Sequence, residues 1–129
     1  MCLDRLVTFE VTKGYGWQVF RKKETGLVQL YRHHFQRHPT IVVAGAWQTD
    51  PSTYYIRPSY GFDRYKTGFH IILGFEDALG YLDHIEFDER IIRKVWFKDV
   101  VATGEEFFSR YPARSAKVVV ARKRYVERA

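Results

Sequence analysis

The chain of 129 residues has the length of a single domain, and its 21 basic residues outnumber 15 acidic ones, giving a formal net charge of +6. Its apolar share of 46% is enough for a core without metal or disulfides, and the single cysteine, Cys2, excludes an intrachain disulfide. Met1–Glu10 lacks the apolar segment of a signal peptide, and no apolar run is long enough to cross a membrane. We therefore expect one cytoplasmic domain, residues 1–129, that contacts no membrane.

Alternating and apolar segments predict strands in the first half of the chain. Strands are expected at 5–12, 17–20 and 27–31, and the short turns between them favour antiparallel neighbours. A further strand is expected at 41–44. The segment 52–66, rich in tyrosine and interrupted by proline and glycine, predicts an ordered aromatic loop with at most short strands.

The second half of the chain predicts one helix among further strands. A strand is expected at 68–73, and 75–84 follows as a helix because its apolar residues share one face and acidic residues occupy its first turn. Long strands are expected at 91–102 and 116–126, with a helical turn at 105–110 between them. The predicted fold class is α+β, a mostly antiparallel β-sheet with one main short α-helix packed on it.

The densest group of polar and aromatic residues precedes that helix. On a strand, His70 would flank Gly68, whose missing side chain leaves room for a ligand, while Phe69 points to the opposite face. The preceding loop adds three residues to the same hollow: Arg64, Tyr65 and Lys66. Histidine beside tyrosine and arginine suits phosphate binding or acid–base chemistry. The alternative is a structural histidine that bonds a carbonyl, with Gly68 at a bulge.

An aromatic group opens at Trp47 and continues through the following loop. Its rings alternate with arginine in the set Trp47, Tyr54, Tyr55, Arg57, Tyr60 and Phe62. Exposed rings of this kind stack on bases or form hot spots for protein partners, and rings turned inward would form a lid on the core. These three interpretations remain open.

Other patterns give no catalytic or metal signature. His33, His34 and His38 lie among Arg32 and Arg37, which would repel a cation, so this segment predicts a basic surface patch. No nucleophile elbow, phosphate-binding loop or paired-carboxylate motif is present. We expect neither metal nor cofactor, and we assign no reaction.

Several short motifs occur in a fixed order along 47–126. The run Tyr65-x-x-Gly68-Phe69-His70-Ile71 is followed by Glu76-Asp77-Ala78, then by Val95-x-Phe97-x-x-Val100, and finally by Val118-Val-Val-Ala-Arg122. In this order the chain resembles a set of small phage and bacterial proteins that share a Tyr-x-x-Gly-Phe-His motif. The resemblance implies a phage or prokaryotic setting, such as a role against a host defence, and it implies no particular reaction. Ile72-Leu73 departs from the aromatic residue expected after the histidine.

The leading hypothesis is a non-catalytic protein that binds a phosphate-bearing ligand, either a nucleotide or a nucleic-acid segment. Basic residues would neutralise phosphate, aromatic residues would stack and His70 would donate or accept a hydrogen bond. The expected ligand-binding residues are Trp47, Arg57, Tyr60, Arg64, Tyr65, Lys66, Phe69 and His70.

Two alternatives remain from the sequence. The first is an inhibitor that covers an acidic protein partner with the basic C-terminal strand, through Arg122, Lys123 and Arg124, and with the aromatic loop. The second is a small transferase or nuclease-like enzyme built around His70. For the strand at 116–126 two alternatives stay open: it is an edge that pairs across a homodimer, or its charges protect that edge from pairing.

Overall fold

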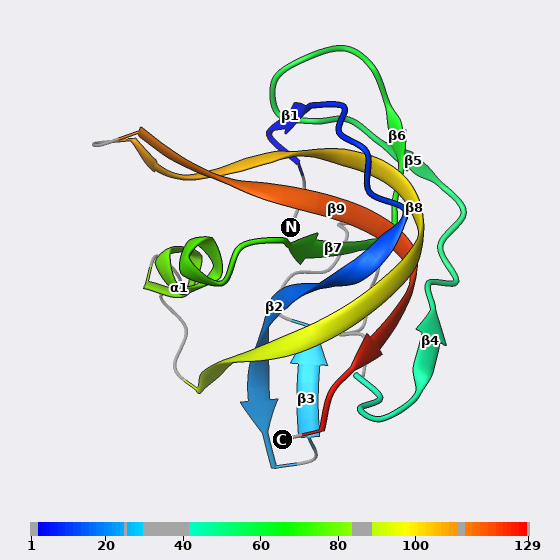
Figure 1. Ribbon diagram of the computed structural model, residues 1–129, viewed down its shortest axis with the longest axis vertical. Helices are drawn as coiled ribbons and strands as arrows, with labels where there is room; N and C mark the ends of the chain where they lie inside the picture. The colour runs from blue at the N-terminus through cyan, green and yellow to red at the C-terminus, as the bar shows by residue number, and fades with distance from the viewer. Residues whose placement is uncertain (1–2, 25, 30–41, 84–88, 111–112, 129) are drawn as a thin grey trace.

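The computed structural model describes residues 3–24, 26–29, 42–83, 89–110 and 113–128 (Figure 1). The predicted fold class is confirmed, because the chain forms a mostly antiparallel β-sheet with one short α-helix packed on it. The elements in chain order are β1 (Arg5–Leu6), β2 (Lys13–Lys23), β3 (Gly26–Gln29), β4 (Trp47–Thr49), β5 (Tyr55–Ile56), β6 (Tyr65–Lys66), β7 (Phe69–Ile72), α1 (Phe75–Asp83), β8 (Arg90–Arg110) and β9 (Ala113–Val126). None of the helical structure in the described ranges has the length and apolar character that crossing a bilayer requires.

Several element boundaries differ from the prediction. The strand expected at 5–12 is only the two-residue β1, whereas β2 begins at Lys13, before its expected start. Val42 and Val43 are not in a strand, and Trp47 begins strand β4 instead of a loop. The helical turn expected at 105–110 was wrong, because this segment pairs with β9 along its length and so continues β8 as strand. The predicted histidine patch at 33–38 lies outside the described residues.

Four strands close on one another in a ring. Strand β2 pairs with β8 on one side and with β7 on the other, while β9 pairs with both β7 and β8. Figure 1 shows β8 and β9 curving together around the molecule. The curvature is consistent with Asp99, which has a φ of 57°, and with a register shift between Val100 and Ala102. The ring β2–β8–β9–β7 therefore has an inner and an outer side.

Two apolar clusters lie on the two sides of the strands. One fills the inside of the ring with side chains from all four strands, including Phe20, Phe69, Phe97 and Val119. The other lies between the outside of β7 and β9 and the segments that cover them, namely α1, β1 and the β5–β6 hairpin. The strands around residues 69–72 and 118–121 are thus buried on both sides, which explains why their residues are apolar apart from His70.

Helix α1 depends on its packing for stability. Gly80 lowers helix propensity by about 1 kcal/mol relative to alanine. A Cβ added at Gly80 would lie 2.8 Å from Cε2 of Phe108, so the absent side chain lets the helix approach β8 closely. Ala78 and Tyr81 are buried in the same interface.

Candidate functional site

His70 is buried and both of its ring nitrogens are engaged. Its Nδ1 lies 3.1 Å from the carbonyl oxygen of Gly68, and its Nε2 lies 3.1 Å from the hydroxyl of Tyr65. That hydroxyl accepts a hydrogen bond from the backbone N–H of Leu3 at 2.8 Å. A neutral imidazole protonated on Nδ1 satisfies every contact, because Nδ1–H then donates to the carbonyl and the tyrosine hydroxyl donates to Nε2. The pair therefore ties the N-terminal segment to β6 and β7.

The space beside Gly68 is occupied by the neighbouring strand. A Cβ at this position would lie 2.6 Å from the carbonyl oxygen of Ala121 on β9. The glycine therefore allows close approach of protein backbone. Of the two interpretations given by the sequence, these contacts match the structural histidine that bonds a carbonyl.

The other predicted ligand-binding residues are not gathered around His70. Phe69 points into the ring, where it is buried. Lys66 lies on β6 opposite Tyr55. Arg57, Tyr60 and Arg64 are exposed on the segment between β5 and β6, and Trp47 is exposed on β4. The structure thus separates the predicted set into a buried group, a hairpin group and Trp47.

The arginines of the C-terminal strand point into the protein. Arg122 donates through its guanidinium to the carbonyl oxygens of Thr67, Asp50 and Ser52, which fastens the loops before β5 and β7 to β9. Arg124 is fully buried and donates to the side-chain oxygens of Gln18 and Gln48. Arg122 and Lys123 are both partly exposed, and the Lys123 side chain, 41% exposed, is paired with Asp99 at 3.3 Å.

Arg124 also contacts two rings inside the strand ring. Its guanidinium carbon lies 3.9 Å from the centre of the Phe69 ring and 5.5 Å from that of Phe20. Burial lowers the pKa of Arg124 to about 9, and the nearby Asp50 opposes this shift. The guanidinium therefore stays charged at neutral pH, held by amide oxygens and aromatic faces.

Glu106 is a second buried ionisable group. Its pKa is raised to about 8, chiefly by burial; the N-terminal positive charge and a hydrogen bond with Tyr81 act to lower it, and the Asp4 carboxylate acts to raise it. One carboxyl oxygen of Glu106 has no hydrogen-bond partner within the described part of the chain. Glu106 is therefore protonated for much of its population at neutral pH.

Exposed aromatic side chains form a line on the outside of the sheet. Tyr15 on β2 lies opposite Trp96 on β8, Trp96 lies opposite Tyr125 on β9, and Tyr125 lies opposite Trp47 on β4. Directly opposed residues project from the same face of a sheet, so the four form one row across four strands. The rings of Tyr15 and Trp96 are 5.1 Å apart, and those of Tyr125 and Trp47 are 5.9 Å apart. We call these four residues the outer row.

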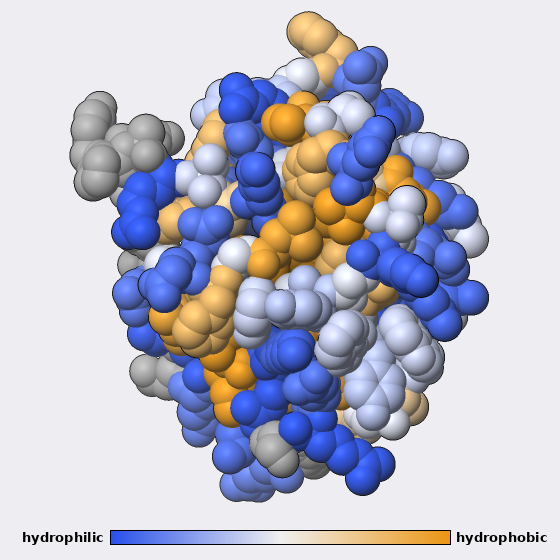
Figure 2. Space-filling model, in the orientation of Figure 1, coloured by the Kyte–Doolittle hydropathy of each residue, from blue (hydrophilic) through white to orange (hydrophobic). Residues whose placement is uncertain are grey.

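Three of the four residues of the outer row are exposed and Tyr125 is partly exposed, and further aromatic residues continue from the row toward the helix. Tyr15 and Trp47 are each 48% exposed and Trp96 is 38% exposed. Trp17, two residues along β2, lies 5.7 Å from the Tyr15 ring, and Phe75 at the start of α1 lies 5.4 Å from Trp17. Figure 2 shows side chains of intermediate hydropathy, in pale colours, gathered over β8, β9 and β4 and bordered by hydrophilic ones.

Lysines line both sides of the outer row. On one side, Lys13 on β2 lies opposite Lys98 on β8, which in turn lies opposite Lys123 on β9. Each of these lysines is two residues away from the outer-row residue of its own strand. Lys94 lies on the other side, with its Nζ 4.4 Å from the centre of the Tyr15 ring and 4.8 Å from that of Trp96. The Nζ of Lys98 lies 4.1 Å from the centre of the Trp47 ring. We call Lys13, Lys94, Lys98 and Lys123 the flanking lysines.

Two carboxylates moderate this positive surface. Glu127 accepts a hydrogen bond from Nε1 of Trp96 at 2.7 Å and lies 3.9 Å from Nζ of Lys94. Asp99 pairs with Lys123. Four lysines face two carboxylates, so the surface keeps a positive balance and Trp96 is held in a fixed orientation.

Most of the outer row was not among the residues predicted from sequence, which included only Trp47. The signal was present in the spacing, because Tyr15 and Trp17 alternate with inward-facing residues and so do Lys94, Trp96 and Lys98. The register that places these alternating residues side by side joins β2 to β8 and β9, which are some 80 to 110 positions away along the chain. No local pattern contains that information.

Within the described ranges, no group of three or more histidine, cysteine, aspartate or glutamate residues is arranged to hold a metal ion. No family model, curated protein or solved structure matches this chain.

Proposed function

We propose that this protein binds single-stranded nucleic acid on the outer row, with bases stacked on the aromatic rings and phosphates near the flanking lysines. The observation that carries the proposal is the register of Tyr15, Trp96, Tyr125 and Trp47 across four adjacent strands. Aromatic platforms bordered by positive charge are the usual way in which proteins hold unpaired strands without reading their sequence.

The length of the outer row favours a polymer over a single nucleotide. Neighbouring strands lie about 4.8 Å apart, so four strands place the first and last rings about 14 Å from each other. That span accommodates several stacked bases in succession. A mononucleotide would use one or two of the four rings and leave the others exposed.

The proposed ligand is of the class predicted from the sequence, a phosphate-bearing nucleic-acid segment. The proposed contact surface is the outer row, in place of the group around His70. His70 and Tyr65 contribute to stability, because their polar groups bond each other and the backbone. The outer row has the exposure that the His70 group lacks, since Tyr65 and His70 are only 4% and 6% exposed.

The test is fluorescence anisotropy with labelled five- and fifteen-nucleotide thymidine oligomers at fixed salt. We expect Trp96→Ala and Tyr15→Ala each to weaken binding between about fivefold and about a hundredfold, because a base–aromatic stack contributes about 1–3 kcal/mol. Lys98→Ala should weaken binding and lower the salt dependence, whereas Lys22→Ala, an exposed lysine elsewhere on β2, is the matched control.

Circular dichroism and the unfolding midpoint check that each variant is folded. Unchanged affinity in the folded Trp96→Ala and Tyr15→Ala variants would remove the outer row as the binding surface. Binding of the wild type to an acidic protein but to neither oligomer would favour the inhibitor alternative instead.

A further inference from the structure

A second exposed group of aromatic and basic residues lies on the β5–β6 hairpin. Residues 57–64 connect β5 to β6, and we call this segment the hairpin tip. Phe62 is 90% exposed, Tyr60 is 61% exposed and Tyr55, at the base of the hairpin, is 60% exposed. Arg57 and Arg64 are exposed at the two ends of the tip. Large apolar rings this exposed, next to arginines, are typical of a contact surface.

The hairpin tip is held in place by the N-terminal segment. The backbone N–H of Ser59 donates to the carbonyl of Leu3 at 3.0 Å, and that of Tyr60 donates to the carbonyl of Asp4 at 2.7 Å. Pro58, between Arg57 and Ser59, is buried. The exposed rings are therefore presented on an anchored backbone, which reduces the entropy lost when a ligand binds.

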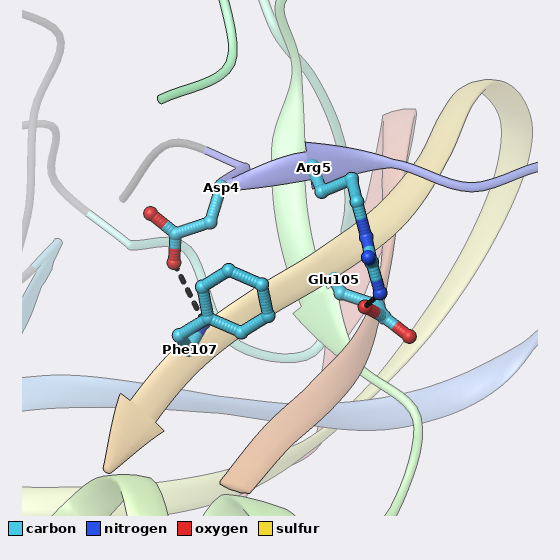
Figure 3. A network of polar contacts seen from close by, with 4 residues as sticks. All are labelled: Asp4, Arg5, Glu105 and Phe107. Atoms are coloured by element: carbon cyan, nitrogen blue, oxygen red, sulfur yellow. Dashed lines mark hydrogen bonds and ion pairs between the residues drawn. The ribbon is translucent and has the colours of Figure 1, made fainter. Parts of the chain in front are cut away.

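The N-terminal segment is in turn fixed to β8. Figure 3 shows the Asp4 carboxylate directed at the backbone nitrogen of Phe107, a hydrogen bond of 2.6 Å, and Arg5 directed at Glu105. The Phe107 ring is 42% exposed and lies 5.8 Å from the Tyr60 ring, and the Arg5 guanidinium lies 5.8 Å from the same Phe107 ring. The aromatic surface of the hairpin tip thus extends onto β8.

The hairpin is also tied to the end of the outer row. Strand β4, which carries Trp47, leads through residues 50–54 into β5, and Figure 1 shows this connection along one edge of the molecule. Arg122 holds the connection by bonding the carbonyls of Asp50 and Ser52. Six residue steps separate Thr49 from Tyr55, so even a fully extended chain places Tyr55 within about 20 Å of Thr49.

We infer that the hairpin tip binds the continuation of the same nucleic-acid strand beyond Trp47, so that the protein holds a longer segment than the outer row alone. This inference rests on the proposed function. Tyr55, Tyr60 and Phe62 provide further faces for bases, and Arg57 and Arg64 pair with phosphates, which the arginine fork suits. The sequence analysis predicted that these two arginines and Tyr60 contact the ligand. In this inference they do so at the hairpin tip, where they bind a second part of the nucleic-acid strand.

The experiment measures the affinity of the wild type and of an Arg57→Ala/Arg64→Ala variant for the five- and fifteen-nucleotide thymidine oligomers. We expect the variant to bind the longer oligomer about tenfold more weakly, with a salt dependence reduced by about 1.4 in the log–log slope, since two phosphate contacts are lost. Its affinity for the shorter oligomer should equal that of the wild type. Phe62→Ala should show the same length selectivity, and because the Phe62 side chain is 90% exposed its removal takes nothing from the core.

An Arg90→Ala/Arg114→Ala variant is the matched control, since both arginines are exposed and lie elsewhere on the described surface. Equal binding of the longer oligomer by wild type and the Arg57→Ala/Arg64→Ala variant would overturn the inference, while a loss in Trp96→Ala would still support the outer row. An equal loss with both oligomer lengths would also overturn it, because the tip would then be a separate site. If neither Trp96→Ala nor Tyr15→Ala weakens binding, the proposed function itself is overturned.

Discussion

The His70–Tyr65 pair and the outer row use similar kinds of residue in opposite ways. In the pair, each polar atom contacts another group of the protein, and a hydrogen-bonded chain runs from Leu3 through both side chains to Gly68. In the outer row, Tyr15, Trp47 and Trp96 are 38–48% exposed and Tyr125 is partly exposed. A dense group of polar and aromatic residues in the sequence can therefore be either an internal hydrogen-bonded group or a ligand-binding surface. The exposure of the side chains distinguishes the two.

The basic residues of the C-terminal strand and those beside the outer row show the same division. Arg122 and Arg124 bond carbonyl and amide oxygens within the protein, whereas Lys94 and Lys98 lie over exposed rings. The comparison predicts that changes to the interior group alter the free energy of unfolding and leave ligand affinity intact. Changes to the exterior group should do the reverse.

The largest expected effect is that of Arg124→Ala. The substitution leaves the side-chain oxygens of Gln18 and Gln48 without this donor and opens space beside Phe69, so we expect a loss of about 3 kcal/mol or more in the free energy of unfolding. Urea denaturation measures it. Lys123→Ala, at the adjacent and partly exposed position, is the control and should change stability by less than about 1 kcal/mol. Similar values for the two variants would contradict an interior role for Arg124.

The next effect concerns pH and Glu106. Its pKa is raised from 4.5 to about 8 in the folded protein, so the folded state binds the proton more tightly than the unfolded state. The contribution of Glu106 to the free energy of unfolding is therefore greatest below pH 4.5. It falls as the pH rises toward 8, by about 3 kcal/mol between pH 4.5 and 7.

Glu106→Gln should remove this dependence and stabilise the protein near pH 8, because the amide is neutral at every pH. Urea midpoints measured from pH 5 to pH 8.5 give the slope. Glu105→Gln is the matched control on the same strand. If the urea midpoint of Glu106→Gln changes with pH as steeply as that of the wild type, other groups cause the pH dependence.

A smaller effect is expected for Tyr65→Phe. The change removes only the hydroxyl, which leaves the N–H of Leu3 and Nε2 of His70 without their partner in a buried place, at a cost of about 2 kcal/mol. Thermal unfolding followed by circular dichroism measures the loss. Oligomer affinity of the folded variant should match the wild type, and a large loss of affinity would return ligand binding to the His70 group.

The smallest effect is expected for Glu127→Gln. Glutamine keeps an oxygen that accepts the Trp96 Nε1–H and removes the negative charge near Lys94, so affinity for the oligomers should rise about twofold to fivefold. Anisotropy titrations at two salt concentrations test it, and the gain should shrink at the higher one because salt screens exposed charges. Weaker binding would show that the carboxylate itself contacts the ligand.

Local patterns were sufficient to predict the helix at 75–84, the strand at 68–73 and the two long C-terminal strands in outline. They failed where pairing with distant strands decides the structure. Trp47 starts a strand because β9 lies beside it, and 105–110 stays extended because it pairs with β9. The aromatic hairpin was anticipated as an ordered loop, yet the division of Tyr65 and Tyr60 between core and surface follows from the docking of Leu3 and Asp4.

The closed ring of strands also has a consequence for how the protein folds. Its pairings join residues as far apart as Lys13 and Lys98, and topologies dominated by such distant pairings fold slowly. Two of the four ring strands, β8 and β9, are synthesised last, and β9 supplies both the partner of β7 and Tyr125 of the outer row. Ring closure must therefore wait until β9 has left the ribosome, and the surface proposed to bind nucleic acid is completed only after translation of almost the whole described chain.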